Sequence, residues 1–265
     1  MTDARAIGVF DSGLGGLTVL TALMRALPHE DFIYFGDTAR VPYGARSSRI
    51  IQRYSQEVAD FLLSHEIKML VIACNTATAH AEDVLKQNLS IPVIGVIQPG
   101  VDALLARTRN RRVGVIGTRS TIKSGEYSRR IQNQSTNIEV FPKACALFVP
   151  LVEEGWVDKR ITALVIQEYL SELIREEVDT VVLGCTHYPL LKTAIQKEYP
   201  DLTLIDSSEE TALTVARSIA SMSLNNNPEH SGHTRIFLSD VTDQMNHLES
   251  LLAGHSFASV QEVQL

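Results

Sequence analysis

Residues 7–27 read IGVFDSGLGGLTVLTALMRAL, and this stretch predicts the fold class. Residues 7–10 are continuously apolar, as in a strand that is buried on both faces. Asp11 and a glycine-rich loop ending at Gly16 follow, and residues 17–27 then carry apolar side chains at helical spacing. A buried strand that runs through a short loop into an amphipathic helix is typical of α/β proteins with a parallel sheet.

The same alternation continues along the first half of the chain. Further apolar strands are predicted at residues 32–35, 69–73 and 93–97, and a helix at residues 48–65 has its apolar side chains on one face. Strands of this kind, separated by helices, indicate a parallel sheet covered on both sides.

The second half repeats this order of elements. Val113 follows Ile7 by 106 residues, Ile138 follows Phe32 by 106 residues, and Cys185 follows Cys74 by 111 residues. A strand at residues 202–206 follows the one at 93–97 by 109 residues. Two unrelated α/β segments can look alike, but four similar offsets in one order favour duplication of a single unit. We therefore predict two similar parallel-sheet α/β domains related by pseudo-twofold symmetry, with the active site in the cleft between them.

The domain boundaries are predicted from turn-forming residues. One lies near Gln98-Pro99-Gly100 and the other near Asp206-Ser207, so the second domain spans residues 99–207 and the first spans 1–98 plus 208–265. In the tail we expect a helix at 211–222, a strand at 234–238 and a helix at 242–253. Periodicity does not decide where this tail packs, and a return to the first domain is one option.

Composition narrows the class of protein. The chain has 265 residues, of which 45% are hydrophobic and 21% charged, and these values are typical of a folded globular protein. Its formal net charge of −7 argues against general affinity for nucleic acid or anionic lipid. A run of basic residues before the strand at 113 is interpreted as a solvated linker: Arg107, Arg109, Arg111 and Arg112.

Cysteine usage and the N-terminal residues indicate a cytoplasmic protein. Three cysteines are too few and too scattered for a disulfide framework. Residues 1–5 are polar and include Asp3, so we expect no signal peptide. The apolar run at 69–74 is too short to span a bilayer, and no membrane association is expected. The oligomeric state is left open, a homodimer included.

Candidate chemistry lies where the predicted strands end. Ligands of open parallel sheets bind beyond the carboxyl ends of the strands. Cys74 and Cys185 each follow an apolar strand, stand beside threonine, and are expected to precede a helix N-terminus that favours a thiolate. If the halves are related by a pseudo-twofold axis, the two thiols face each other across one cleft. Such a pair suits removal of a proton from one face of a carbon acid and delivery of another to the opposite face.

Other interpretations of the cysteines remain open. A free cysteine is more often a small buried hydrophobe than a reagent. A disulfide would be unusual in a reducing compartment, and Cys185 and His187 are the only close pair that a zinc site would use. Cys145 lacks polar neighbours and is interpreted as structural.

Several polar residues near these strand ends have two interpretations each. Asp11 is either a helix cap or an acceptor for a substrate ammonium group that also influences Cys74. His187 either tunes Cys185 or is a hydrogen-bonded loop residue. Glu153 and Glu154 are interpreted first as an exposed pair at a helix end and second as carboxylates acting on the site. Gly13, Gly15 and Gly16 do not fit a nucleotide-binding pattern, although such a loop can hold a carboxylate.

The blocks around these residues resemble those of glutamate racemases, and they occur in family order between residue 7 and about residue 206. The matching blocks are FDSGLGGLTV at 10–19, GDTARVPYG at 36–44, ACNTA at 73–77, GTxxTIxS at 117–124 (x being any residue), PLVEEG at 150–155 and LGCTHYPLL at 183–191.

The resemblance implies interconversion of L- and D-glutamate, which supplies D-glutamate for peptidoglycan, cell-wall biogenesis and cell shape. It implies no cofactor and no metal. The residues implied to be catalytic are Cys74, Cys185, Asp11, His187 and Glu153. The residues implied to contact substrate are Asp11, Ser12, Pro42, Tyr43, Gly44, Asn75, Thr76, Thr118, Thr121, Thr186 and His187.

Two other functions are compatible with this pattern. One is a related racemase acting on aspartate or hydantoin. The other is a non-catalytic amino-acid-binding or partner protein, which would leave the paired thiols unexplained.

Overall fold

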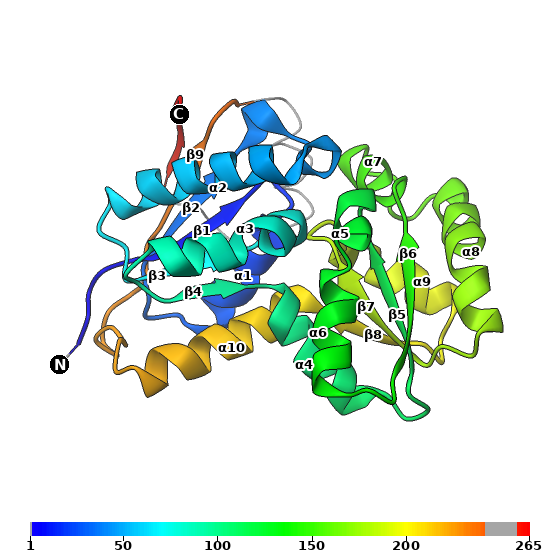
Figure 1. Ribbon diagram of the computed structural model, residues 1–265. Coiled ribbons are helices and arrows are strands. Elements are labelled where there is room, and N and C mark those ends of the chain that lie inside the picture. The colour runs from blue at the N-terminus through cyan, green and yellow to red at the C-terminus, as the bar shows by residue number, and fades with distance from the viewer. Residues whose placement is uncertain (1, 242–258) are drawn as a thin grey trace.

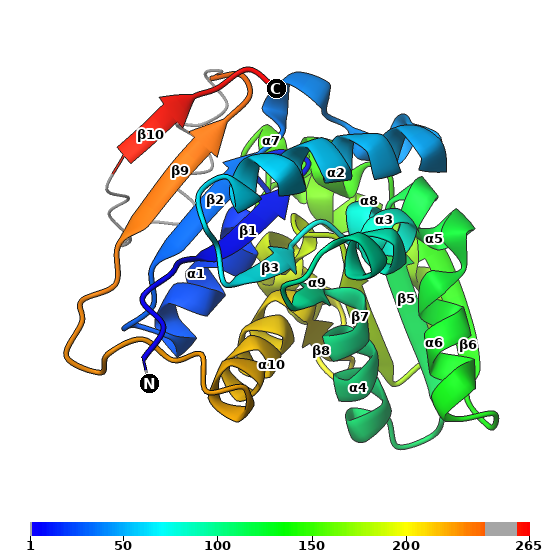
Figure 2. The same ribbon diagram turned by 60° about the vertical axis from the view of Figure 1, so that its left-hand side comes forward.

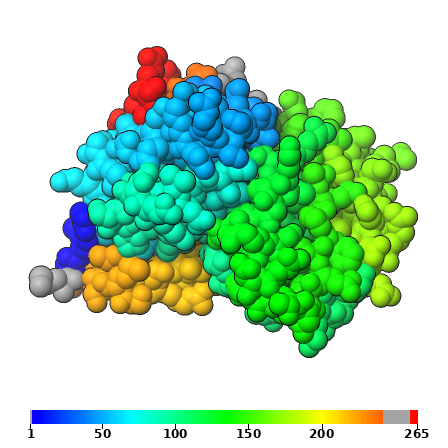
Figure 3. Space-filling view, in the orientation of Figure 1, coloured from blue at the N-terminus to red at the C-terminus, as the bar shows by residue number. Residues whose placement is uncertain are grey.

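The computed structural model describes residues 2–241 and 259–265, and two lobes stand side by side in it (Figure 1). Each lobe is built around one parallel sheet. Turning the molecule brings the tail strands into view at the outer edge of the first lobe (Figure 2). The space-filling view shows the lobes meeting along a continuous seam (Figure 3). The predicted α/β fold with two similar parallel-sheet lobes is confirmed.

The two sheets share one strand order. In the first sheet the order is β10-β9-β2-β1-β3-β4, and in the second it is β6-β5-β7-β8. The strands of the first are β1 (Ile7–Asp11), β2 (Phe32–Gly36), β3 (Met69–Ile72), β4 (Val93–Gly95), β9 (Thr234–Leu238) and β10 (Ser259–Glu262). The strands of the second are β5 (Arg112–Gly117), β6 (Glu139–Ala144), β7 (Thr180–Gly184) and β8 (Thr203–Asp206). The order 2-1-3-4 in one lobe is thus matched by 6-5-7-8 in the other, in line with duplication.

Helices cover both faces of each sheet. The first lobe contains α1 (Leu17–Ala26), α2 (Ser48–Leu63) and α3 (Asn75–Asn88), with short 3₁₀ turns η1 (Thr38–Arg40) and η2 (Tyr43–Ala45). The second contains α5 (Arg119–Ser124), α6 (Glu126–Gln134), α7 (Phe148–Glu153), α8 (Arg160–Arg175), η3 (Tyr188–Leu191) and α9 (Lys192–Glu198). The chain crosses between the sheets through α4 (Ile97–Arg107) and α10 (Ser207–Ser221).

Alternation along the strands divides the core into layers. Ile7 and Val9 pack with apolar residues of α1 and α10 on one face of the first sheet. Phe10 packs on the other face, with residues of α2 and α3. Because both faces are buried, β1 reads as a continuous apolar run rather than an alternating one, which is why its strand character is visible in the sequence.

The tail returns to the first lobe. Strand β9 pairs in parallel with β2, and α10 packs against α1. The strand predicted at 234–238 is therefore confirmed and adds to the first sheet. The helix predicted at 242–253 lies outside the described residues.

Two predicted element boundaries are wrong, the end of β4 and the start of α10. The strand predicted at 93–97 ends at Gly95, and Gln98-Pro99-Gly100 lies inside the first turns of α4, because proline is tolerated where a helix N–H has no intrahelical partner. The tail helix begins at Ser207 rather than at residue 211, since Asp206 caps it by accepting from the Ser208 N–H.

Among the described residues, no helix is both long enough and apolar enough to cross a bilayer. The basic run includes residues held in ion pairs: Arg107 contacts Glu210 at 2.6 Å, and Arg112 contacts Glu176 at 3.0 Å.

A buried ion pair ties the first lobe to its tail. Lys68 Nζ lies 2.5 Å from Glu30 Oε2, and both side chains are almost fully buried. The same ammonium donates to the carbonyl of Asp3 at 2.6 Å, and Glu30 Oε1 accepts from the N–H of Asn226 at 2.8 Å. One buried pair therefore joins the N-terminal segment, the loop before β2 and the segment that leads to β9.

We expect Glu30→Gln to lower the free energy of unfolding by about 3–5 kcal/mol, because it leaves the Lys68 ammonium buried without its counter-charge. Urea denaturation followed by circular dichroism measures the change. The matched control is Glu209→Gln, which removes a carboxylate from an exposed pair with Lys192 at 3.5 Å and should change stability by less than about 1 kcal/mol. Equal effects of the two variants would contradict the role assigned to the buried pair.

Candidate active site

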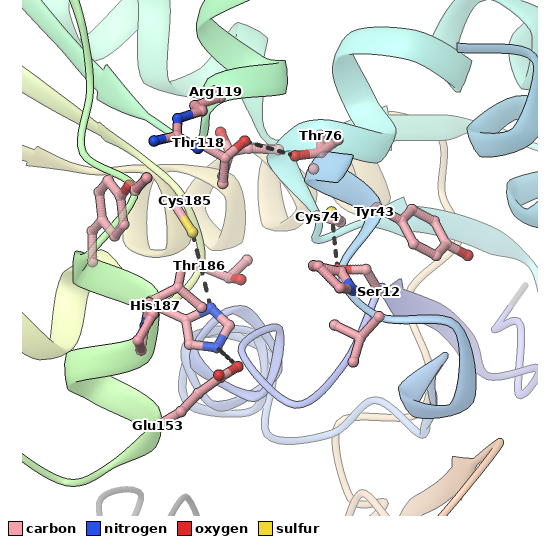
Figure 4. A pocket seen from close by; sticks show the side chains of 18 residues that line it. Ser12, Tyr43, Cys74, Thr76, Thr118, Arg119, Glu153, Cys185, Thr186 and His187 are labelled. Carbon is pink, nitrogen blue, oxygen red and sulfur yellow. Dashed lines mark hydrogen bonds and ion pairs between the residues drawn. The ribbon is translucent and has the colours of Figure 1, made fainter. Parts of the chain in front are cut away.

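A cavity of about 380 Å³ opens at the carboxyl ends of the strands, between the lobes. Cys74 after β3 and Cys185 after β7 both line it, and Figure 4 shows them across the pocket from each other. Most of the residues predicted to contact substrate line it as well: Ser12, Pro42, Tyr43, Gly44, Asn75, Thr76, Thr118, Thr186 and His187. The sequence-based expectation that the two thiols share one cavity therefore agrees with the geometry.

Cys74 occupies the N-cap position of α3. Its sulfur accepts from the Ala77 N–H at 3.4 Å, and its thiol donates to Ser12 Oγ at 3.5 Å. Burial, the nearby Asp11 carboxylate and the facing Cys185 raise the pKa of the Cys74 thiol to about 12, and these effects outweigh the hydrogen bonds that lower it. The helix N-terminus alone therefore does not make Cys74 a thiolate in the unliganded cavity.

Cys185 has a different environment. The prediction that a helix N-terminus follows it is wrong: the chain forms the 3₁₀ turn η3 from Tyr188, and α9 begins only at Lys192. In place of a helix, Cys185 Sγ has the His187 imidazole, with Nδ1 at 3.9 Å. On the far side of the ring, Nε2 lies 3.2 Å from Glu153 Oε1. The three side chains form a line along one wall of the pocket (Figure 4).

The charge on His187 follows from its two neighbours. Burial disfavours its protonation, but interactions with Cys185 and Glu153 outweigh burial and raise the pKa of the imidazole to about 10. His187 is therefore an imidazolium at neutral pH, beside the sulfur of Cys185. The first interpretation of Glu153 and Glu154 as an exposed pair is wrong for Glu153, which lines the cavity, while Glu154 is exposed.

Asp11 lies beneath the glycine loop and does not line the cavity. One carboxylate oxygen accepts from the Gly13 N–H at 3.0 Å, while the other is buried without a hydrogen-bond partner among the described residues. The interpretation of Asp11 as a helix cap is wrong, since Gly16 occupies that position of α1. Burial raises the pKa of Asp11, against the opposing effects of the His187 charge and backbone N–H donors.

The glycine loop permits the lobes to approach closely. A Cβ at Gly15 would lie 2.5 Å from the His187 ring and 2.5 Å from Thr186 Oγ1. A Cβ at Gly16 would lie 2.4 Å from that of Asp11. Beside this contact, Thr18 Oγ1 donates to the Thr186 carbonyl at 3.0 Å. Only glycine at position 15 lets the Thr186-His187 segment reach the first lobe in this arrangement.

A second contact between the lobes is made of hydroxyl groups. Thr76 Oγ1 lies 3.1 Å from both Thr118 Oγ1 and Thr121 Oγ1, which are 3.0 Å apart. Thr76 and Thr118 line the cavity, whereas Thr121 lies behind them. The three hydroxyls form hydrogen bonds with one another, which fixes their orientation. Two of them, those of Thr76 and Thr118, are polar groups at the cavity wall.

Asn75 and Tyr43 are both held by buried hydrogen bonds. The Asn75 side-chain oxygen accepts from the Tyr127 hydroxyl of α6 at 2.7 Å, which leaves its NH₂ group buried without a partner among the described residues. Tyr43 donates its hydroxyl to Asp37 at 2.5 Å, and that hydroxyl points away from the cavity in Figure 4. Tyr43 therefore offers the cavity its ring and backbone rather than its hydroxyl.

Some residues of the site were not identified from the sequence. Arg119 and Val41 line the cavity, and Tyr127 orients Asn75 from the other lobe. Val41 lies in the block at 36–44 and Arg119 in the block at 117–124, each next to a residue that was predicted to contact substrate. This adjacency is the one signal in the sequence that could have identified them. Cys145 is buried and free, as expected for a structural residue. Among the residues that the structure describes, no three His, Cys, Asp or Glu side chains are arranged to hold a metal ion.

The geometry defines an α/β protein whose cavity carries one cysteine from each of two matched lobes. Comparison with known proteins agrees. The Asp/Glu/Hydantoin racemase family model matches residues 7–215. A glutamate racemase from Geobacter metallireducens is 49% identical over 98% of this chain and 97% of its own length.

Solved structures give the same result. A glutamate racemase isoform from Bacillus anthracis has a TM-score of 0.94 at 38% identity, covering 98% of each chain. The Francisella tularensis glutamate racemase in complex with D-glutamate has a TM-score of 0.92 at 39% identity, covering 99% of this chain and 98% of its own. The chain belongs to the Asp/Glu/Hydantoin racemase family and is an isomerase. The resemblance found in the motifs is confirmed.

We expect Gly15→Ala to reduce racemase activity at least tenfold, because the new methyl group would push Thr186 and His187 away from the first lobe. Steady-state kinetics followed by circular dichroism measures this. Gly13→Ala is the matched control, since its Cβ would meet only Val41, at 3.4 Å. If the two variants lose activity equally, the close approach at Gly15 is not what matters.

We expect Glu153→Gln to lower the pKa of His187 by about 1 unit or more, because the variant removes the negative charge beside Nε2. Because the folded-state pKa of about 10 lies above the ordinary value of 6.5, the stability that His187 contributes is fully present below pH 6.5 and is lost as pH rises through 10. In the variant this loss should begin at lower pH.

Titration of the histidine ring signals by NMR measures the shift, with the His187 signal assigned by its absence in His187→Gln. Glu154→Gln is the control, because this neighbour is exposed, and the pKa should stay in place. An unchanged pKa in Glu153→Gln would show that the carboxylate does not hold the imidazolium.

Proposed function

We propose that the protein interconverts L- and D-glutamate by proton transfer at Cα between Cys74 and Cys185, without a cofactor. The observation that carries this proposal is the placement of one thiol from each lobe across a single cavity. Racemisation needs a base on one face of the carbon and an acid on the other, and two thiols supply both.

Glutamate is favoured as the substrate by the relatives. Those reported above are glutamate racemases that match almost the whole chain, and one was solved with D-glutamate. The polar lining suits a small dicarboxylate with an ammonium group. The unpartnered NH₂ of Asn75, which lines the cavity, is suited to a carboxylate. The Asp11 carboxylate beneath the glycine loop adds negative charge that favours an ammonium group in the cavity.

The proton transfers balance in either direction. One cysteine thiolate takes the proton from Cα and becomes a thiol, while the electron pair of the C–H bond moves into the adjoining carboxylate system. The other cysteine gives its thiol proton to the opposite face of Cα and becomes the thiolate. Hydrogen-bond donors at the carboxylate, among them Asn75 and the hydroxyls of Thr76 and Thr118, stabilise the charge that develops there.

The two cysteines have different surroundings. The pKa of about 12 keeps Cys74 a thiol at neutral pH, ready to donate. Cys185, which lies beside the His187 imidazolium, is assigned as the group that accepts the proton in the first direction. In the proposed reverse direction Cys74 must lose its proton. An ammonium group bound near Asp11 would offset the negative charge that now raises the pKa of Cys74.

The proposed reaction supplies D-glutamate for peptidoglycan and takes place in the cytoplasm. Three free, buried cysteines suit a reducing compartment. The division into domains of residues 1–98 plus 208–265 and residues 99–207 is proposed on the same basis as before, and the cavity between them is expected to close over substrate. A homodimer stays a prediction.

We expect Cys74→Ala and Cys185→Ala each to abolish racemisation of L-glutamate, because each variant lacks one of the two proton-transfer groups. Circular dichroism of the amino acid measures turnover, with L-aspartate incubated separately to test substrate choice. In deuterated water the unaltered enzyme should place deuterium at Cα. Cys145→Ala is the control, since this cysteine is buried outside the cavity lining. Full racemisation by either single variant would rule out the two-thiol mechanism, and faster turnover of aspartate would rule out glutamate as the preferred substrate.

A further inference from the structure

Arg119 lies at the edge of the cavity, and nothing in the two-thiol mechanism uses it. It is the first residue of α5, directly after Thr118, and its side chain lines the pocket. Figure 4 shows it beside Thr118, on the same side of the pocket as Cys185. The residue is exposed to solvent. Its position is that of a charge at an entrance rather than a group in a packed core.

No structural contact among the described residues explains this side chain. The arginines of the next helix are held by carboxylates: Arg129 contacts Glu126 at 2.6 Å, and Arg130 contacts Glu82 at 2.7 Å. Arg119 forms no ion pair with any residue of the described ranges, 2–241 and 259–265. Its backbone is nevertheless held in place, because the neighbouring Thr118 accepts from the Thr121 N–H at 3.2 Å and caps the helix.

The charges around the cavity give this arginine its importance. Within the described lining, Arg119 is the one lysine or arginine. The other charged groups of the lining, His187 and Glu153, face each other at 3.2 Å and largely cancel. The protein as a whole carries a net charge of −7, which repels an anion. Arg119 is therefore the main local attraction for a negatively charged molecule entering this cavity.

We propose that Arg119 is a specificity-determining residue that draws a dicarboxylate amino acid into the cavity by its charge. This inference rests on the proposed function, because glutamate at neutral pH carries two carboxylates, one ammonium group and a net charge of −1. The attraction acts on entry and binding and is the same for both enantiomers. It therefore lowers KM and leaves kcat unchanged, as expected for an interaction that is equal in the ground and transition states.

The proposed attraction is electrostatic, so it depends on salt. At 0.1 M ionic strength the Debye length is about 10 Å, and charges at an exposed rim are increasingly screened as salt rises. Charges at a rim change the association rate and its salt dependence more than they change the chemistry. A guiding role and a structural role therefore make different predictions.

The experiment compares Arg119→Gln, Arg119→Lys and Lys123→Gln with the unaltered enzyme. Lys123 is the matched control: it is an exposed cation one turn further along α5, it does not line the cavity, and its replacement removes the same charge. KM and kcat for both L- and D-glutamate are measured at about 20 mM and about 300 mM salt. We expect Arg119→Gln to raise KM about three- to tenfold at low salt, with kcat within about twofold. At high salt the difference should shrink, Arg119→Lys should keep most of the effect, and Lys123→Gln should behave like the unaltered enzyme.

Three results would overturn the inference. They are an unchanged KM in Arg119→Gln, an equal rise in Lys123→Gln, and a fall in kcat at constant KM, which would place Arg119 in the chemical step. If the unaltered enzyme turns over glutamate and Arg119→Gln does not differ from it, only the role of Arg119 fails. If the unaltered enzyme does not turn over glutamate, the proposed function fails and takes this inference with it.

Discussion

The arrangement of the site depends on one close contact, in which the Thr186-His187 segment of the second lobe rests on the glycine loop of the first. Gly15 makes this contact possible, because any side chain there would overlap the His187 ring. Because Cys185 is next to the Thr186-His187 segment in the chain, the contact also places Cys185 at the cavity. Cys74, which follows β3, lines the same cavity. Two sheets with matched strand order provide two equivalent strand ends, and the glycine loop lets those ends meet.

The matched strands of the two lobes do not form two equal sites. Cys74 begins a regular helix and accepts one of its N–H groups, whereas Cys185 leads into a 3₁₀ turn and has an imidazolium beside it. The buried Asp11 carboxylate is near Cys74, whereas the Glu153 carboxylate contacts His187, which lies beside Cys185. Burial holds the proton on Cys74, while Cys185 has a positively charged imidazolium as its neighbour. In the proposed reaction one thiol donates and the other accepts from the outset, although the backbone around them is similar.

The sequence predicted the parts of this structure that have local or periodic causes. Strands buried on both faces appear as apolar runs, and their spacing predicted the second lobe and the position of both cysteines at strand ends. The contacts between the lobes do not follow from any local or periodic pattern in the sequence. That Glu153 reaches His187, or that Tyr127 orients Asn75, depends on how two helices pack onto distant strands. Proline at position 99 suggested a boundary, yet it fits the first turn of α4, because local turn chemistry is the same at a helix start.

Two buried polar side chains at the site each have one end held by a hydrogen bond. A buried amide NH₂ or carboxylate oxygen without a partner is unfavourable, and two such groups, on Asn75 and Asp11, lie at or beneath the cavity wall among the described residues. The other end of each group is fixed in place by a hydrogen bond. The Tyr127 hydroxyl holds the oxygen of the Asn75 amide, and the Gly13 N–H holds one oxygen of Asp11. Because Asn75 lines the cavity and one end of its amide is held, its NH₂ group needs little rearrangement to meet a ligand. In the proposed function, a small charged amino acid that pairs with these groups would recover the free energy that their burial costs.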